Sequence, residues 1–308
     1  MKTITAEPYL DIHCGLGEGP FWEENKNVLR FVDIMNKSIW YVDLTVGPAS
    51  ARHHEYEYSI GVTCDLEGVE DKILFGGKHG VGVAEKHSSK YRYIQRFWTP
   101  EEVEKGNEER MRANDGAIDS QGRFWVSAFN DPSITKLEPV GVLFRLDTDG
   151  SFHRMVEGLT IPNGTSWSLD DKTMYFTDSG AQTIYAYDFD AATGNISNKR
   201  VFFRVEEEGC APDGHAMDVE GNIWVAIWGG WKVVRVNPEG KVTAEIKVPT
   251  RCPTCAVIAG EDIYITSEAD PEVDKYPESK RYSGGVFKAY IGIPGKRPNK
   301  ARVPIGRK

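Results

Sequence analysis

The stretch from Ile161 to Asp178 reads IPNGTSWSLDDKTMYFTD. Its last part, Met174 to Thr177, is rich in aromatic and β-suited residues and is flanked by turn formers, which is typical of a strand. Ahead of it, the dipeptide Asn163-Gly164 has the composition of a tight turn, and alone it says little. The stretch becomes informative because the same pattern recurs along the chain.

Strand-like segments recur six times, and successive segments begin roughly 40–50 residues apart, which is the spacing of propeller blades. They cover residues 29–33, 73–77, 123–127, 174–178, 223–227 and 263–267. A second apolar or aromatic strand and a polar hairpin turn follow most of them. Each unit is then a small antiparallel sheet that cannot bury both of its faces alone, whereas six units packed around an axis can. The sequence therefore predicts an all-β fold, a six-bladed β-propeller of four-stranded antiparallel blades.

The two ends of the chain and three insertions complete this prediction. We expect one propeller domain over residues 1–308, with residues 7–13 closing the last blade as its outer strand and residues 295–308 forming a basic surface tail. Thr99-Pro100-Glu101-Glu102 predicts a short capped helix in a surface excursion that runs to Met111. Residues 130–140 and 268–283 are expected to be loops, the second over one end of the ring.

Composition excludes several classes of function. The formal charge of −9 argues against a nucleic-acid-binding face, and no apolar run is long enough to span a bilayer. The first residues lack the apolar segment of a signal peptide, so we expect a cytoplasmic protein, acting as a monomer. Five scattered cysteines fit buried or partly buried free thiols better than a redox or zinc site, although Cys252 and Cys255 have CxxC spacing.

Polar residues occupy matching places in the repeats. In five units the residue before the glycine of the turn that precedes each predicted inner strand is Glu18, Ile60, Asp115, Asn163 or Asp213. Equivalent positions of different blades meet around the axis of a propeller, so Glu18, Asn163 and Asp213 should converge. Two carboxylates and one amide oxygen form an oxygen-only site that suits a divalent cation. The alternative is that all of them are ordinary turn residues.

These motifs resemble those of the SMP-30/gluconolactonase/LRE family, six-bladed propellers that include regucalcin and sugar lactonases. The resemblance is carried by GLGEGP at residues 15–20, RANDG at 112–116, IPNG at 161–164, PDG at 212–214 and SGGVF at 283–287. It implies that Glu18, Asn163 and Asp213 hold one divalent metal ion (Ca, Mg, Mn, Zn or Fe(II)) and that Arg112 and Asn114 contact substrate oxygens. The acidic residue that the family commonly places after the arginine strand is not assigned here.

The expected activity is metal-dependent hydrolysis of a small sugar lactone to an aldonic acid. The metal would polarise the lactone carbonyl, and Asp213 is the first candidate and Asp115 the second for the group that deprotonates the water. His215 is a candidate substrate contact or, equally, a packed histidine. Two other readings stay open: hydrolysis of other esters or organophosphates at the same site, and a calcium-binding propeller without turnover.

Overall fold

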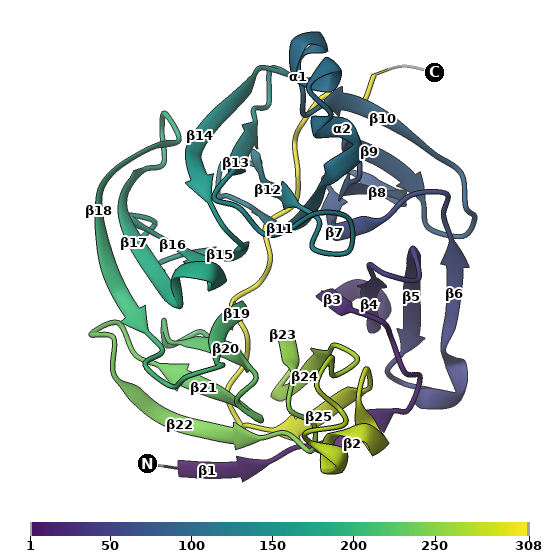
Figure 1. Ribbon diagram of the computed structural model, residues 1–308, viewed down its shortest axis with the longest axis vertical. Helices are drawn as coiled ribbons and strands as arrows, with labels where there is room; N and C mark the ends of the chain where they lie inside the picture. Colours follow the sequence, from purple (N-terminus) through teal and green to yellow (C-terminus); the bar gives the residue numbers. More distant parts are fainter. Residues whose placement is uncertain (1, 307–308) are drawn as a thin grey trace.

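The computed structural model describes residues 2–306 and forms a closed ring of six antiparallel sheets around a central axis (Figure 1). The first three blades are β3 (Gly17–Glu23), β4 (Val28–Asp33), β5 (Ser38–Asp43) and β6 (Arg52–Glu55); β7 (Ile60–Leu66), β8 (Val69–Gly77), β9 (Gly80–Glu85) and β10 (Tyr91–Arg96); and β11 (Met111–Ile118), β12 (Phe124–Asn130), β13 (Gly141–Leu146) and β14 (Phe152–Leu159). The predicted six-bladed propeller is confirmed.

The other three blades follow the same order from the axis outward. They are β15 (Pro162–Trp167), β16 (Thr173–Asp178), β17 (Thr183–Asp190) and β18 (Asn195–Arg204); β19 (Ala211–Met217), β20 (Ile223–Trp228), β21 (Lys232–Val236) and β22 (Val242–Lys247); and β23 (Pro253–Ala259), β24 (Asp262–Ser267) and β25 (Val286–Tyr290). The strands predicted as innermost are in fact second from the axis, because another strand precedes each of them in its blade.

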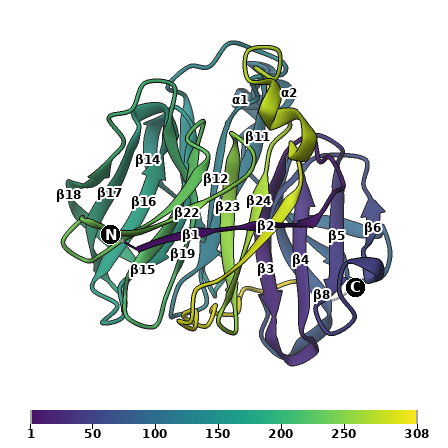
Figure 2. The same cartoon turned by 90° about the horizontal axis from the view of Figure 1, so that it is seen from below.

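The N-terminal segment closes the ring, as the sequence predicted. Strand β2 (Glu7–Leu10) pairs antiparallel with β25 and becomes the outer strand of the sixth blade. One further strand was not predicted: β1 (Lys2–Thr5) pairs parallel with β22, so the fifth blade has five strands instead of four. Figure 2 shows this purple segment passing from β1 to β2 along two neighbouring blades. Such an edge pairing cannot be read from four residues, because it depends on where the preceding blade ends.

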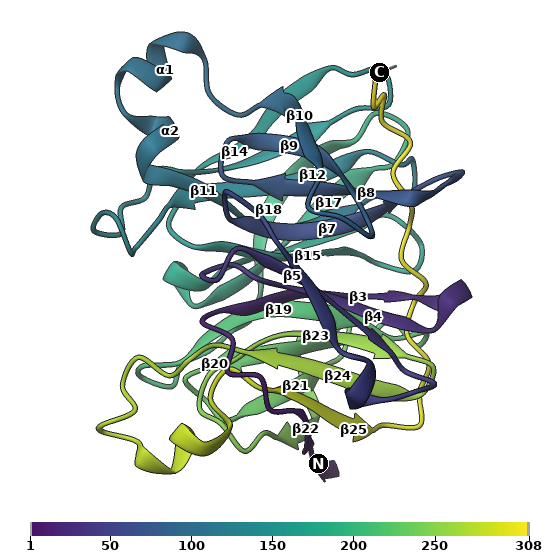
Figure 3. The same ribbon diagram turned by 90° about the vertical axis from the view of Figure 1, so that its right-hand side faces the viewer.

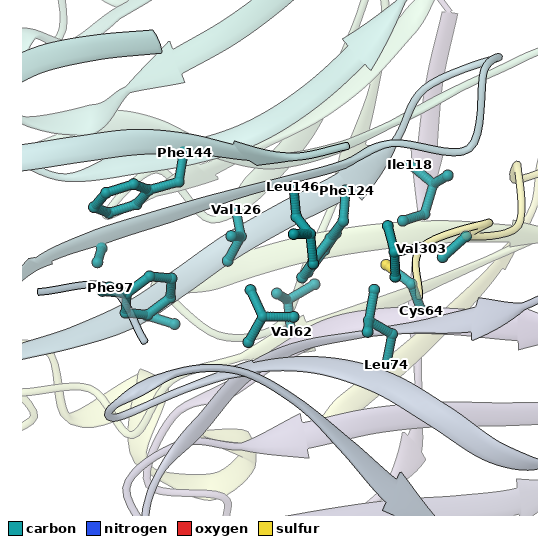
Figure 4. Close-up of a cluster of buried hydrophobic side chains, with 14 of the residues drawn as sticks. Val62, Cys64, Leu74, Phe97, Ile118, Phe124, Val126, Phe144, Leu146 and Val303 are labelled. Carbon is teal, nitrogen blue, oxygen red and sulfur yellow. The ribbon is translucent and has the colours of Figure 1, made fainter. Parts of the chain in front are cut away.

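The core lies between neighbouring blades rather than at the axis. Between the second and third blades, Val62 and Leu74 pack with Val126 and Phe144 in one apolar cluster (Figure 4). Their burial removes apolar surface from water on both faces of each sheet, which is the main favourable term for the ring. Blade packing of this kind leaves the axis free for polar side chains.

The excursion between the second and third blades contains the predicted helix. Helix α1 (Pro100–Glu104) begins at a capping box in which the Thr99 amide donates to Glu102 Oε2 (2.9 Å) and the Glu102 amide donates to Thr99 Oγ1 (3.4 Å). A second short helix, α2 (Asn107–Arg110), leads into β11. Figure 3 shows both helices and the 268–283 loop, which contains a 3₁₀ helix at Pro277–Tyr282, at the end of the ring where the innermost strands begin. We call this the entry end.

The C-terminal tail crosses the opposite end of the ring, and we call residues 294–306 the strap. It lies over the surface but is not loose, since Ala301 and Val303 are buried. Residues 307–308 of the predicted tail lie outside the described residues. It bonds to or pairs with the last residues of four innermost strands, Met217, Trp167, Ile118 and Leu66. The tail prediction missed this role because alternating small apolar residues within a basic segment give no strong strand or helix signal.

The strap gives a test of the packing described here. Val303 is 7% exposed and belongs to the cluster between the second and third blades, so Val303→Ala should lower the free energy of unfolding by about 1–3 kcal/mol. Val46, which is 65% exposed, supplies the matched control, and Val46→Ala should change it by less than about 0.5 kcal/mol. Urea denaturation measures both, and equal effects would contradict a packed strap.

Candidate functional site

The polar residues singled out in the sequence lie inside the innermost strands. Asn163 and Gly164 belong to β15, so their assignment to a turn is wrong. Between Pro162 and Thr165 the pairing of β15 with β16 shifts by one residue, which makes a β-bulge. Every innermost strand has such a shift at the same depth: Glu18/Phe21, Ile60/Val62, Ala113/Gly116, Pro162/Thr165, Pro212/His215 and Pro253/Ala256. Bulges of this kind re-aim side chains next to functional sites.

The glycines of the bulges are required by close approach, not by turn geometry. A Cβ atom on Gly164 would lie 2.3 Å from His215 Nδ1, and one on Gly214 would lie 2.3 Å from Cys255 Sγ. Neighbouring innermost strands therefore approach so closely at this depth that a side chain has no room between them. This explains why Asn-Gly and Asp-Gly recur at the axis without forming a turn.

The bulge corrects the alignment of the third blade by one residue. There the unpaired residues are Asn114 and Asp115, and they correspond to Asn163 and Gly164 of the fourth blade. Asn114, not Asp115, is thus the equivalent of Asn163. The sequence alignment failed because it used the glycine as its marker, and in the third blade Gly116 follows the bulge instead of belonging to it.

A chain of hydrogen bonds links Arg112 and the two asparagines across three blades. Arg112 Nη1 donates to Asn114 Oδ1 (2.8 Å), Asn114 Nδ2 donates to Asn163 Oδ1 (3.0 Å), Asn163 Nδ2 donates to Ser179 Oγ (2.9 Å), and Ser179 Oγ donates to the Pro212 carbonyl (2.7 Å). Because a guanidinium can only donate, the bond to Arg112 fixes which end of each amide carries oxygen. The Asn163 oxygen consequently faces Asn114, and it keeps a second lone pair.

Three buried carboxyl groups meet at this depth. Glu18 is 4% exposed, Asp213 7% and Asp115 8%. Burial, and then the nearby charge of the other carboxylates, holds the pKa values of Glu18 and Asp213 well above their usual range. Burial also raises the pKa of Asp115, to about 6. The Asp213 Oδ1 atom is buried without a hydrogen-bond partner. Burying a carboxylate oxygen in this way lowers the free energy of unfolding.

This donor set suits a divalent cation. Within residues 2–306 no group of three His, Cys, Asp or Glu side chains can hold a metal ion by itself, so a cation here would need the Asn163 oxygen beside the carboxylates of Glu18 and Asp213. Two carboxylates and one amide oxygen are hard ligands of the kind that Ca²⁺, Mg²⁺ and Mn²⁺ prefer. A cation would also satisfy the unpaired Asp213 oxygen and reduce the repulsion among the carboxylates, so the residues fit the ion.

Two acidic residues at the site were missed in the sequence. Asp131 follows β12, and its Oδ2 atom lies 3.5 Å from Arg112 Nε. Pairing of β11 with β12 places it there, since Met111 opposes Asn130. Glu268 follows β24 and accepts a hydrogen bond from Trp228 Nε1 (2.6 Å). Neither residue repeats between blades, so a search for repeats could not find it.

His215 and Asp115 face the inside of the ring. They line an axial cavity of about 180 Å³, which residues 295–299 of the strap border at the far end. His215 Nε2 lies 2.8 Å from Ser166 Oγ, and burial lowers the pKa of the imidazole to about 4. The structure thus gives His215 the contacts of a packed neutral histidine, and its contact with substrate stays a prediction.

The cysteines behave as expected. All five are free and buried, including the pair Cys252 and Cys255. Burial raises the pKa of the Cys255 thiol, and the nearby Asp115 carboxylate raises it further, so this residue is held in its neutral form.

The raised pKa of Asp115 predicts how stability depends on pH in metal-free protein. Because the folded-state pKa is about 6 and the usual value is 3.8, the folded protein binds a proton more tightly than the unfolded chain. The stabilisation is present below pH 4 and is lost as pH rises through 6, a change of about 3 kcal/mol. Asp115→Asn should flatten this part of the profile in urea denaturation between pH 4.5 and 7.5, while the exposed Asp274→Asn should follow wild type. An unchanged slope in Asp115→Asn would contradict the assignment.

Known proteins share this architecture. Residues 16–269 match the family described as the SMP-30/Gluconolactonase/LRE-like region. A Bacillus subtilis (strain 168) protein provisionally named the sugar lactone lactonase YvrE is 28% identical over 94% of this chain and 95% of its own length. Regucalcin of Bos taurus is 31% identical over 97% of this chain and 98% of its own length.

A solved structure has the same ring. The crystal structure of a calcium-binding protein, regucalcin, from Agrobacterium tumefaciens superimposes with a TM-score of 0.87 at 20% identity, and covers 98% of this chain and 100% of the other. At this identity the match concerns the fold alone. Together with the family match over most of the chain, these relatives show that the protein belongs to the SMP-30/gluconolactonase/LRE-like family.

Proposed function

We propose that this protein is a metal-dependent hydrolase that opens small sugar lactones to aldonic acids. The observation that carries the proposal is the buried, unpartnered Asp213 Oδ1 beside Glu18, with the Arg112 guanidinium in the same site. A fold stabilised by blade packing alone has no need of buried carboxylates that repel one another. The family name and the name of the Bacillus relative point to the same chemistry.

Glu18, Asn163 and Asp213 would hold a divalent cation, which when bound polarises a carbonyl group and lowers the pKa of water. The chain's own residues orient the reactants. Asn114 holds the Asn163 oxygen in place, and Arg112 presents its positive charge to substrate oxygens. Phe129 lies under the guanidinium, 4.7 Å from the ring centre, and keeps it in one plane.

Asp213 is proposed as the group that accepts the proton of the attacking water. Its Oδ1 atom is buried at the site without a hydrogen-bond partner. Because a metal-bound carboxylate is a weak base, the lowered pKa of the water would supply most of the activation. Water adds to the lactone carbonyl carbon, the bond from that carbon to the ring oxygen breaks, and the proton passes to the departing ring oxygen. The product is the open-chain hydroxy acid. Asp115, one residue deeper than Asn114, is the second candidate for this role.

The thiols support a proposal for the cell compartment. Five free and buried cysteines are typical of a reducing environment, so we propose that the reaction takes place in the cytoplasm. No helix in the described chain, residues 2–306, is long and apolar enough to cross a bilayer.

The test is acid release from a panel of aldonolactones, followed before and after chelation. Activity should disappear on chelation and return when one of Ca²⁺, Mg²⁺, Mn²⁺, Zn²⁺ or Fe²⁺ is added, and Asp213→Asn should not recover. Activity that survives both chelation and Asp213→Asn would contradict the mechanism. Tight Ca²⁺ binding without turnover of any lactone would favour a calcium-binding protein instead.

A second variant tests the neutral ligand. Asn163→Ala should leave the fold intact and raise the metal concentration needed for half-maximal activity by about 10- to 100-fold, since even supporting partners of metal ligands have effects of this size. The exposed Asn25→Ala is the matched control and should bind metal like wild type. If Asn163→Ala instead unfolds the protein in circular dichroism while its folded fraction binds metal normally, Asn163 is a structural residue only.

A further inference from the structure

Glu268 lies one layer closer to the entry end than the three carboxyl groups. Its backbone forms a bridge with Leu16, which is two residues before Glu18 in the first blade. Its side chain bonds to Trp228, which pairs with Ala211 in the fifth blade. Ala211 in turn is two residues before Asp213. The Glu268 carboxylate is thereby held between the first and fifth blades, on the entry-end side of the candidate metal ligands.

Arg112 occupies the same layer on the other side of the axis. It comes two residues before Asn114 in the third blade, while Glu268 follows β24 of the sixth, and these two blades face each other across a ring of six. The two side chains are close enough for their charges to interact. Burial raises the pKa of Glu268, and the positive charge of Arg112 partly offsets that rise. Arg112 and Glu268 therefore stand on opposite sides of the axis, and we call these sides the cationic wall and the acceptor wall.

The acceptor wall is rigid because the 268–283 loop is pinned to the fifth and sixth blades. Arg251 donates from Nε and Nη2 to Asp270 (2.9 and 2.7 Å), and both side chains are buried. Its guanidinium carbon lies 5.2 Å from the centre of the Trp228 ring and 4.6 Å from that of Tyr276. The tryptophan that holds Glu268 is thus itself held in place, and such support is what a positioning group requires.

We propose that Glu268 is a substrate-positioning residue that accepts hydrogen bonds from sugar hydroxyl groups and thereby selects hydroxylated lactones. The inference rests on the proposed lactonase function. Trp228 engages Oε2, which leaves Oε1 for a hydroxyl donor, and an ionised carboxylate can only accept. Arg112, a donor, meets the acceptor oxygens of the same molecule on the opposite wall, so a lactone with hydroxyls on one side binds in one orientation.

The experiment compares D-glucono-1,5-lactone with δ-valerolactone, which has the same ring size and no hydroxyl groups. In Glu268→Gln, kcat/KM for the hydroxylated lactone should fall at least about tenfold more than for δ-valerolactone, mainly through KM, since a bond to a charged acceptor contributes about 1.5–3 kcal/mol. Trp228→Phe, which keeps a ring and removes the donor, should change the ratio in the same direction by less. Glu278→Gln on the exposed part of the loop and Trp231→Phe on the same hairpin are the matched controls and should keep the wild-type ratio.

Three outcomes would overturn the inference. Equal losses for the two lactones would make Glu268 a structural residue, and weaker metal binding in Glu268→Gln would make it a metal ligand. If wild type hydrolyses neither lactone, the proposed function fails, and the role of Glu268 is then tested separately by calorimetric titration of metal-loaded protein with D-glucitol. A dissociation constant for D-glucitol that rises about tenfold in Glu268→Gln supports the acceptor wall. The same dissociation constant in both proteins, or no binding to wild type, contradicts it.

Discussion

The close approach of the six innermost strands at the axis is the constraint on which the rest of the site depends. A Cβ atom on Gly61 would lie 2.3 Å from the backbone oxygen of Asn114, so at this depth there is no room for side chains between adjacent strands. Each innermost strand has one extra residue at this depth, and in the fourth and fifth blades Gly164 and Gly214 take the crowded place beside Asn163 and Asp213. The bulge therefore brings residues as far apart in sequence as Glu18 and Asp213 into one small volume.

The buried carboxyl groups in that volume lower the stability of the fold, because their negative charges repel one another. Glu18, Asp115 and Asp213 are all buried. The charges of Asp131 and then of Glu18 favour the charged form of the Arg112 guanidinium, against its burial. Buried groups with unfavourable ionisation are typical of functional sites, where local stability is given up for chemistry. The apolar clusters between blades are far enough from the axis to keep the ring folded despite this local cost.

The sequence was most informative where side chains pack between blades and least informative at the axis. Met174 to Thr177 has the aromatic and β-suited residues of a buried strand, and such segments were enough to count the blades. Pro162 to Trp167 also forms a strand. Its Asn-Gly-Thr-Ser composition reflects crowding at the axis, but the same composition is typical of a turn. The three candidate ligands were found because they repeat, and the place of Asp115 was misjudged by one residue because a bulge leaves no mark in sequence.

Residues that act across blades could not be found in this way. Glu268 depends on Leu16 from the first blade and on Trp228 from the fifth, the two neighbours of its own blade, so its position is a property of the closed ring. Asp131 reaches Arg112 only through the register of β11 and β12. The strap likewise depends on the spacing of four strand ends, which no local pattern of residues encodes.

Ring closure through β2 and β25 also has a consequence for the order of folding. The first five inner sheets are hairpins of nearby residues, which can form as the chain leaves the ribosome, but the sixth blade joins residues 7–10 to residues 286–288. Contacts across so much chain are slow to form, because the loop entropy is lost before they are made. Glu18 and Asp213 stand in the blades on either side of that last blade, so their carboxylates stay hydrated and apart until almost the whole protein has been synthesised.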